Sequence, residues 1–215
     1  QIVAVDVAKT SEPKIVSSLD VDPKDYAEFG PVLMLGTQCF VSYKESLLSE
    51  STYTHRYKMR VLDFADPAAP VLGEIVSVPG MVEGVHQPNS NAVVLFSSVP
   101  KVRFDEELWF STSNSLLQAS VYDGNQAFLV SEITIEDGRY TRTLVLGDRI
   151  VKPGFDENEA GLRTWRWNQS DEGGELGEYG FVSLGASPSE LRAHNGLIFA
   201  QSNRQISVLD QDLVV

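Results

Sequence analysis

Acidic, aromatic and histidine side chains are the residues of this chain that could do chemistry, and many of them fall in three stretches between apolar runs. The stretches cover 44–57, 98–115 and 153–161. Aromatic side chains mixed with charges are typical of surfaces that bind other proteins. The candidate binding residues are Tyr53, His55, Phe104, Asp105, Glu106, Trp109 and Phe155. For Trp109 an alternative stays open, in which the indole extends a strand and packs inward.

One acidic group in the third stretch could bind a metal ion. Its carboxylates belong to Asp156, Glu157 and Glu159, and calcium prefers several oxygen ligands of this kind. The spacing differs from that of an EF-hand loop, and most charge runs are solvated. Calcium at this group is therefore an open alternative to a solvated loop, and no other cofactor is predicted.

Histidine and tryptophan pairs occur within the apolar runs. His86 and His194 hold similar places in two expected strands, but their blades are two apart, and this separation favours two hydrogen-bonded strand histidines over a shared metal. Trp165 and Trp167 are two residues apart and therefore face the same side of a strand. A sugar-stacking pair is one interpretation, and the pattern favours packing in the core.

No sequence motif for covalent catalysis or phosphate binding is present. The G-x-S-x-G, Walker and G-x-G-x-x-G patterns are absent. Cys39 is the only cysteine, which excludes an intrachain disulfide, and its apolar surroundings predict a buried, unreactive thiol. Whether the chain is an enzyme stays open, and the sequence favours a non-catalytic protein.

The composition is that of a globular, acidic protein. The chain has 215 residues, of which 42% are hydrophobic and 22% charged, and its net charge is −13. Such an acidic balance argues against binding to nucleic acid or to an anionic membrane. No apolar run approaches the roughly 18 residues that a membrane helix needs, so no transmembrane segment is predicted.

The elements that position these residues repeat along the chain. In each copy a β-branched run ends in an aspartate, a turn follows, and a second apolar run begins. The aspartates are Asp6, Asp63 and Asp123, and a looser copy ends at Asn168. Between these units lie hairpins, whose turn residues tolerate a positive φ. The hairpin turns are predicted at Gly36, Asn91, Gly147 and Asn195.

Four short strands in each repeat of roughly 40–60 residues predict an all-β fold, a β-propeller of four-stranded antiparallel blades. One domain covers 1–215, with full blades at about 31–78, 84–135 and 143–185 and blade remnants at 1–22 and 191–215. About four blades are thus expected. The strand count favours a stretch of a larger propeller over a four-bladed ring with one redundant strand. An irregular β-sandwich is the competing fold.

The segment VLDFADPAAPVLGEI at 61–75, echoed by VAVDVAKTSEPKIVSSL at 3–19, resembles the unit of LVIVD-type repeats. These repeats occur in secreted bacterial β-propellers that are distantly similar to WD40 proteins. The resemblance rests on Asp63 and Pro67, with a looser match at Asp6 and Pro13. It implies a propeller fold, an extracytoplasmic setting (periplasmic, secreted or cell-surface) and a role as an interaction scaffold, and it names no active site.

The long stretches indicate where a propeller of this kind would bind. All three connect the second and third strands of a repeat, and such connections share one face of a propeller. Loops on a rigid scaffold often carry function, so the pattern predicts a non-catalytic scaffold that binds a protein or surface ligand through that face. The remainder of a propeller is an alternative partner. The alternative function is a propeller enzyme, a hydrolase or oxidoreductase, with a metal or carboxylate site at the channel mouth.

Overall fold

The computed structural model describes most of the chain. It covers residues 1–9, 11–21, 27–49, 52–89, 92–104, 110–136, 143–156, 159–170, 173–203 and 205–210, with 47–49, 52–54, 101–104, 110–113 and 136 as backbone only. The regular elements of these residues are all β-strands, which confirms the all-β prediction. In the same residues no helix is long and apolar enough to cross a membrane.

The described strands form five antiparallel sheets, and each sheet joins strands that are consecutive along the chain. Sheet 1 pairs β1 (Ile2–Asp6) with β2 (Lys14–Leu19). Sheet 2 contains β3 (Ala27–Leu35), β4 (Gln38–Ser49), β5 (Thr52–Asp63) and β6 (Val71–Val78). Sheet 3 contains β7 (Met81–Asn89), β8 (Ala92–Phe104), β9 (Phe110–Tyr122) and β10 (Ala127–Glu136). Sheet 4 contains β11 (Leu144–Leu146), β12 (Arg149–Asp156), β13 (Glu159–Ser170) and β14 (Gly173–Ser183). Sheet 5 contains β15 (Glu190–His194), β16 (Leu197–Gln201) and β17 (Ile206–Asp210).

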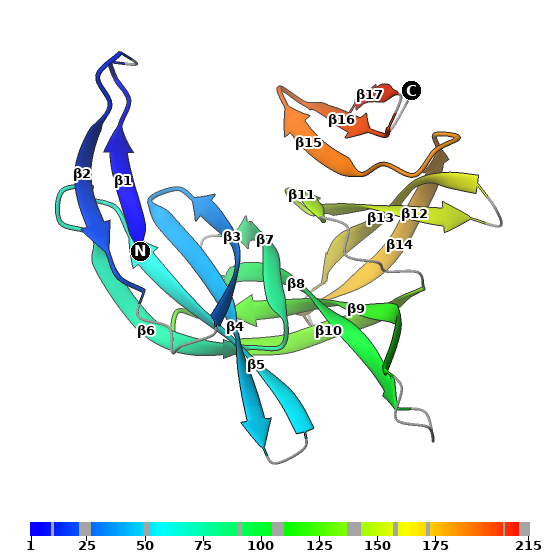
Figure 1. Cartoon of the computed structure of the whole chain (residues 1–215), viewed down its shortest axis with the longest axis horizontal. Helices are drawn as coiled ribbons and strands as arrows, with labels where there is room; N and C mark the ends of the chain where they lie inside the picture. The colour runs from blue at the N-terminus through cyan, green and yellow to red at the C-terminus, as the bar shows by residue number, and fades with distance from the viewer. Residues whose placement is uncertain are drawn as a thin grey trace.

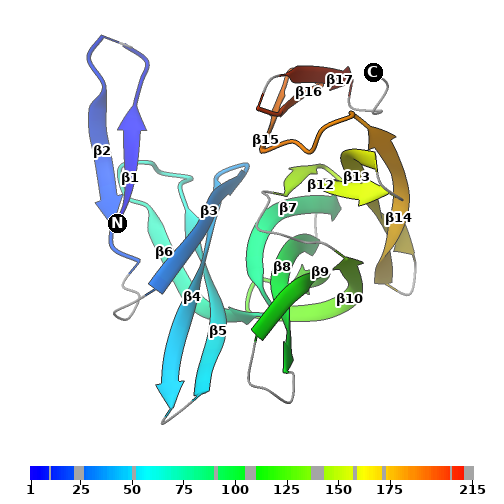
Figure 2. The same cartoon turned by 45° about the vertical axis from the view of Figure 1, so that its right-hand side comes forward.

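The sheets follow one another along an open arc (Figures 1 and 2). The first strands of sheets 2 to 5 are neighbours, since β3 contacts β7, β7 contacts β11, and β11 contacts β15. The last strands of sheets 2 to 4 are neighbours as well, since β6 contacts β10 and β10 contacts β14. Sheets 1 and 5 stand apart at the two ends of the arc in both views.

The core is divided among the interfaces between neighbouring sheets. One buried apolar cluster fills each interface, from sheets 1 and 2 through to sheets 4 and 5. Trp165 and Trp167 belong to the cluster between sheets 3 and 4 and are 4% and 3% exposed, which confirms the predicted core packing. Cys39 lies buried between sheets 1 and 2, which confirms the predicted burial of its thiol.

The turns have the hydrogen bonds and backbone φ angles that their residues predict. Oδ1 of Asp63 accepts a hydrogen bond of 2.8 Å from the backbone N–H of Ala65, and Oδ1 of Asp6 accepts one of 2.8 Å from that of Ala8. Positive φ angles mark three of the predicted hairpin turns, with 58° at Gly36, 61° at Gly147 and 50° at Asn195. The fourth, at Asn91, lies outside the described residues.

The strand register corrects the alignment of the repeat in sheet 4. The first residue after each hairpin turn pairs with the repeat aspartate in sheets 2 and 5, as Gln38 with Asp63 and Leu197 with Asp210. In sheet 4 the same pair is Arg149 with Arg166. Arg166, and not Asn168, therefore takes the place of the aspartate. Without an aspartate turn at this point, β13 continues to Ser170.

The three long stretches are strands rather than loops where they are described, so this part of the sequence interpretation is wrong. Their outermost described pairs are Ser49 with Thr52, Phe104 with Phe110, and Asp156 with Glu159. Polar and apolar residues both occur along these hairpins without a regular alternation, and this hides their strand character in the sequence. In both views the hairpins β4–β5 and β8–β9 extend beyond their sheets on the same side (Figures 1 and 2).

Candidate functional site

The predicted binding residues are spread over three hairpins. Tyr53 and His55 lie in β5, Phe104 lies in β8, and Phe155 lies in β12. Asp105, Glu106 and Trp109 lie outside the described residues. The His55 ring is exposed, with Nδ1 3.2 Å from Oγ of Ser46, and Phe155 is 48% exposed.

The predicted calcium ligands lie at the tip of the β12–β13 hairpin. Asp156 and Glu159 are exposed cross-strand partners, and Glu157 lies outside the described residues. Nη2 of Arg163 is 3.5 Å from Oδ1 of Asp156. Across the part of the chain that the structure describes, no group of three or more His, Cys, Asp or Glu residues is placed to hold a metal ion. Calcium stays a prediction.

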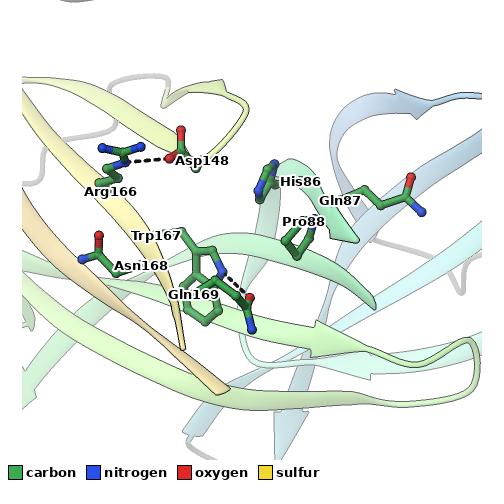
Figure 3. Close-up of a pocket in the computed structure, with 8 residues that line it drawn as sticks. All are labelled: His86, Gln87, Pro88, Asp148, Arg166, Trp167, Asn168 and Gln169. Carbon is green, nitrogen blue, oxygen red and sulfur yellow. Dashed lines mark hydrogen bonds and ion pairs between the residues drawn. The ribbon is translucent and has the colours of Figure 1, made fainter. Parts of the chain in front are cut away.

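A cavity of about 420 Å³ lies between sheets 3 and 4, at the ends of the strands opposite the long hairpins (Figure 3). One wall comes from the end of β7. The other comes from the β11–β12 turn and the last part of β13. The lining residues are His86, Gln87, Pro88, Asp148, Arg166, Trp167, Asn168 and Gln169.

The floor of this cavity is fixed by the continuation of β13 beyond Arg166. Trp167 is buried against Phe96 of sheet 3, with ring centroids 6.4 Å apart in an edge-on arrangement. Its Nε1 donates a 3.1 Å hydrogen bond to Oε1 of Gln169, whose Nε2 donates one of 2.6 Å to the carbonyl of Gly173. Gly174 leaves the space that the indole fills, because a Cβ there would overlap the ring.

Arg166 is held by charge and by an aromatic ring. Its Nε donates a 2.6 Å hydrogen bond to Oδ2 of Asp148, and its guanidinium carbon lies 6.0 Å from the centre of the Tyr179 ring. The guanidinium carbon of Arg149 lies 5.3 Å from the centre of the same ring. The hydrogen bond and the charge of Asp148 raise the pKa of Arg166, so its guanidinium stays charged throughout the physiological range.

His86 forms the wall that faces this ion pair (Figure 3). Burial lowers the pKa of His86, and the charge of Asp148 acts in the opposite direction and only partly offsets it. The imidazole is therefore neutral at pH 7, with one nitrogen that donates and one that accepts.

At neutral pH the cavity is polar with no net charge. The carboxylate of Asp148 offsets the guanidinium of Arg166, and the amides of Gln87, Asn168 and Gln169 add donors and acceptors. None of the described residues that line it has a hydroxyl, thiol or amine side chain. The arrangement suits binding of a polar, uncharged or zwitterionic group.

A second cavity, of about 460 Å³, occupies the equivalent place between sheets 2 and 3. Its lining includes Asp63 and Asp123, and Gln87 lines both cavities. Asp123 follows Tyr122, the partner of Val93, and therefore holds the same repeat position as Arg166. The same position thus carries a negative charge in one cavity and a positive charge in the next.

The two predicted strand histidines lie in different settings. His86 is half-buried in β7 of sheet 3, and His194 is exposed at the end of β15 in sheet 5. The structure does not bring them together in one sheet or one described interface between sheets.

Sequence reasoning singled out one lining residue from each wall of the cavity and missed the others. His86 and Trp167 stood out by residue type, but Asp148, Arg166 and Gln87 did not, because they lie in or next to strands rather than in a long connection. One signal in the sequence could have pointed to this region. The run of glycines after Ser170, at 173, 174 and 177, is unusual for a strand and marks a place where a large side chain crosses the neighbouring strand.

The fold and the cavities define an all-β protein of stacked antiparallel sheets with polar cavities between them. Comparison of the chain with protein-family models and with curated proteins finds no match. The similarity of 61–75 to LVIVD-type repeats stays a prediction.

Proposed function

We propose that the chain is a run of β-propeller blades of the LVIVD type that acts as a non-catalytic, extracytoplasmic interaction scaffold. The stacking of the sheets supports the propeller. Successive first strands contact each other, as do successive last strands, and this is the arrangement of blades that radiate from a common centre. Each four-stranded sheet is also a meander of consecutive strands, as a blade is.

The observation that carries the binding role is the pair of hairpins on one side of the array. The described residues 46–49 and 52–56 of the β4–β5 hairpin lie beyond the last pairs with β3 and β6. The pairs that involve Arg103 and Phe104 of the β8–β9 hairpin likewise lie beyond β7 and β10. Two hairpins that rise from neighbouring sheets on one side form the walls of a surface that a protein or surface ligand can occupy.

Shortening each hairpin tests the proposal without disturbing its sheet. One variant replaces 102–113 with Asn-Gly and so joins the cross-strand partners Lys101 and Asn114. A second replaces 47–54 with Asn-Gly between the partners Ser46 and His55. Asn-Gly forms the two-residue turn that such hairpins favour. Circular dichroism and thermal unfolding check that each variant folds.

A matched control shortens a hairpin on the opposite side. It replaces 169–174 with Asn-Gly between Asn168 and Glu175. Chemical cross-linking of each tagged chain in an extract of the source organism, followed by mass spectrometry, identifies partners. We expect partners captured by the wild type and the control to be lost from both hairpin variants. Partners retained by the hairpin variants and lost from the control would contradict the proposal.

A propeller enzyme is the second candidate, and the cavity that joins His86 with the Asp148–Arg166 pair is the observation that favours it. Such an enzyme would place a metal or carboxylate site at the mouth of the channel. Elemental analysis of the purified chain tests the metal form of this alternative, because a stoichiometric ion that survives dialysis would favour the enzyme over the scaffold.

A further inference from the structure

The two charged side chains of the cavity between sheets 3 and 4 keep hydrogen-bonding groups that the fold does not use. Nε of Arg166 donates a 2.6 Å hydrogen bond to Oδ2 of Asp148, and among the described residues neither side chain makes another. A guanidinium has five N–H donors, and a carboxylate accepts through both of its oxygens. Both side chains are also partly exposed, at 44% and 31%. Nη1 and Nη2 of Arg166 and Oδ1 of Asp148 are therefore available to a ligand.

Arg166 is held in place before any ligand arrives. Asp148 fixes its Nε, and the centre of the Tyr179 ring lies 6.0 Å from the guanidinium carbon. The backbone N–H of Trp167 also donates a 2.8 Å hydrogen bond to the carbonyl of Asp148, so the segments that carry the two charges are joined through the backbone as well. A side chain that is already ordered loses little conformational freedom on binding. The planar fork of nitrogens on Arg166 is therefore prepared to bind a carboxylate.

His86 adds an acceptor on the facing wall of the cavity. Asp148 lies between Arg166 and His86 in Figure 3. Burial lowers the pKa of His86, so the imidazole is neutral at pH 7 and one of its nitrogens accepts a hydrogen bond. Within the described chain the ring makes no hydrogen bond to another residue. Oδ1 of Asp148 and one nitrogen of His86 are thus two acceptors in the same cavity as the donors of Arg166.

The balance of charge in the cavity selects the kind of ligand. One positive and one negative side chain line it, and the whole chain has a net charge of −13. A simple anion would meet the repulsion of Asp148 and of the acidic chain, and a simple cation would meet the repulsion of Arg166. A ligand with one charge of each sign pairs with both side chains and leaves the cavity neutral.

The size and the floor of the cavity restrict the ligand further. A volume of about 420 Å³ holds a small molecule. Trp167 is 3% exposed because it packs against Phe96, so it offers no open face on which a sugar ring can stack. The amides of Gln87 and Asn168 add donors and acceptors to the lining. These features favour a small zwitterion over an uncharged sugar.

We propose that this cavity binds a free α-amino acid in its zwitterionic form. The guanidinium of Arg166 binds the carboxylate, and Asp148 and His86 accept hydrogen bonds from the ammonium group. A single carbon separates the two charges of such a ligand, and the two charged side chains that receive them are in direct contact at 2.6 Å. This binding role does not depend on the proposed scaffold role, because the long hairpins lie at the opposite ends of the strands.

A set of matched probes tests the proposal on the wild-type chain. Glycine, L-serine and L-glutamine carry both charges, their N-acetyl forms lack the ammonium group, and their amide forms lack the carboxylate. The chain has three tryptophans, so a nitrogen-15 tryptophan label gives few NMR signals, and the signal of the Trp167 indole N–H is assigned by its loss in Trp167→Phe. We expect at least one zwitterion to shift this signal saturably below about 10 mM. Both of its modified forms should bind at least about tenfold weaker, because each loses charge-assisted hydrogen bonds.

Two variants test the side chains to which the charges are assigned. Arg166→Gln and Asp148→Asn each remove one charge and keep a polar side chain, and we expect each to weaken binding of the zwitterion at least about tenfold. Arg192→Gln, in the exposed pair with Glu190, is the matched control and should bind as the wild type does. Circular dichroism checks that each variant folds, and the probe series on the wild type decides alone where a variant does not.

Four results would overturn the proposal. The first is the lack of any shift of the Trp167 signal with all three zwitterions up to about 50 mM. The second is equal binding of a zwitterion and its N-acetyl or amide form. The third is unchanged affinity in the folded Arg166→Gln and Asp148→Asn variants. The fourth is tighter binding of glucose than of any zwitterion, which would assign the cavity to an uncharged sugar instead.

Discussion

Nε of Arg166 donates a 2.6 Å hydrogen bond to Asp148, at the one repeat position where sheet 4 carries an arginine while sheets 2, 3 and 5 carry an aspartate. The backbone N–H of Trp167 also donates to the carbonyl of Asp148, at 2.8 Å, and Phe64 makes the same backbone bond to Thr37 in sheet 2, at 2.8 Å. The repeat thus keeps its backbone contact and exchanges its charge.

Charge reversal at Arg166 should lower thermal stability. Arg166→Asp restores the residue type of the other sheets but places a second carboxylate beside Asp148. We expect Tm, measured by circular dichroism, to fall by about 2–4 °C, because the pair lies near the surface. The double exchange Asp148→Arg with Arg166→Asp should recover most of the loss. Arg192→Ser, which breaks the exposed pair with Glu190, is the control, and an equal fall there would show that the Arg166 pair has no special role.

The indole of Trp167 should make Gly174 intolerant of a side chain. Gly174→Ala places a methyl group where the ring lies, so we expect the free energy of unfolding in urea to fall by about 1–3 kcal/mol. Gly177→Ala is the matched control in the same strand, since its Cβ would first meet Nδ2 of Asn168 at 3.0 Å, and that amide can move. Equal stability of the two variants would contradict this account of the glycines.

The stability that the Asp123 carboxylate contributes should be lost in acid. The backbone N–H groups of Asn125 and Gln126 each donate to its Oδ1 at 2.9 Å and hold the pKa of Asp123 below its ordinary value of 3.8. A carboxylate whose pKa is lower in the folded chain stabilises the fold above the unfolded value, and this contribution is lost as pH falls through the folded value.

Two substitutions separate this charge from the turn that it forms. Asp123→Asn keeps an oxygen that can accept from the turn and no longer titrates. We expect its urea midpoint to depend less on pH than that of the wild type below about pH 4. Asp123→Ala should lower the midpoint at neutral pH as well, because the turn loses its acceptor. Parallel acid profiles for the wild type and Asp123→Asn would exclude a role for this carboxylate.

Cys39 should be unreactive until the chain unfolds. The side chain is 1% exposed, and burial raises the pKa of its thiol, so both access and thiolate content are low in the folded chain. Iodoacetamide followed by mass spectrometry should show negligible alkylation at pH 8 and complete alkylation in urea. Rapid labelling of the folded chain would show that the interface between sheets 1 and 2 opens locally.

The strand framework could be predicted from the sequence because its signals are local. The β-branched run before Asp63 predicts a strand, and the residues directly after it predict a turn, so both signals lie within a few residues. The hydrogen bond from Ala65 to Asp63 is the one that such a turn predicts. The spacing of Trp165 and Trp167 likewise places both indoles on one face, and that face is buried.

The cavity could not be predicted from the sequence because no local signal joins its walls. His86 and Arg166 come from different sheets, and the strand register that places Arg166 at the aspartate position follows from its pairing with Arg149. The sequence suggests instead that the copy ends at Asn168. The hairpins were hidden for a related reason, since the described residues 46–49 pair with 52–55 of the same hairpin, and polar and apolar residues do not alternate regularly there.

The restriction of each sheet to consecutive strands has a consequence for how the molecule melts. Hydrogen-bonded pairing of this kind is short in range along the chain, so each sheet can form as a separate unit, and neighbouring units are coupled through the side chains at their interfaces. Loosening one interface, such as that of Phe96 and Trp167, should let the sheets on its two sides melt at different temperatures. The heat-capacity trace would then divide into two peaks, and cooperativity in this protein would be a property of its interfaces.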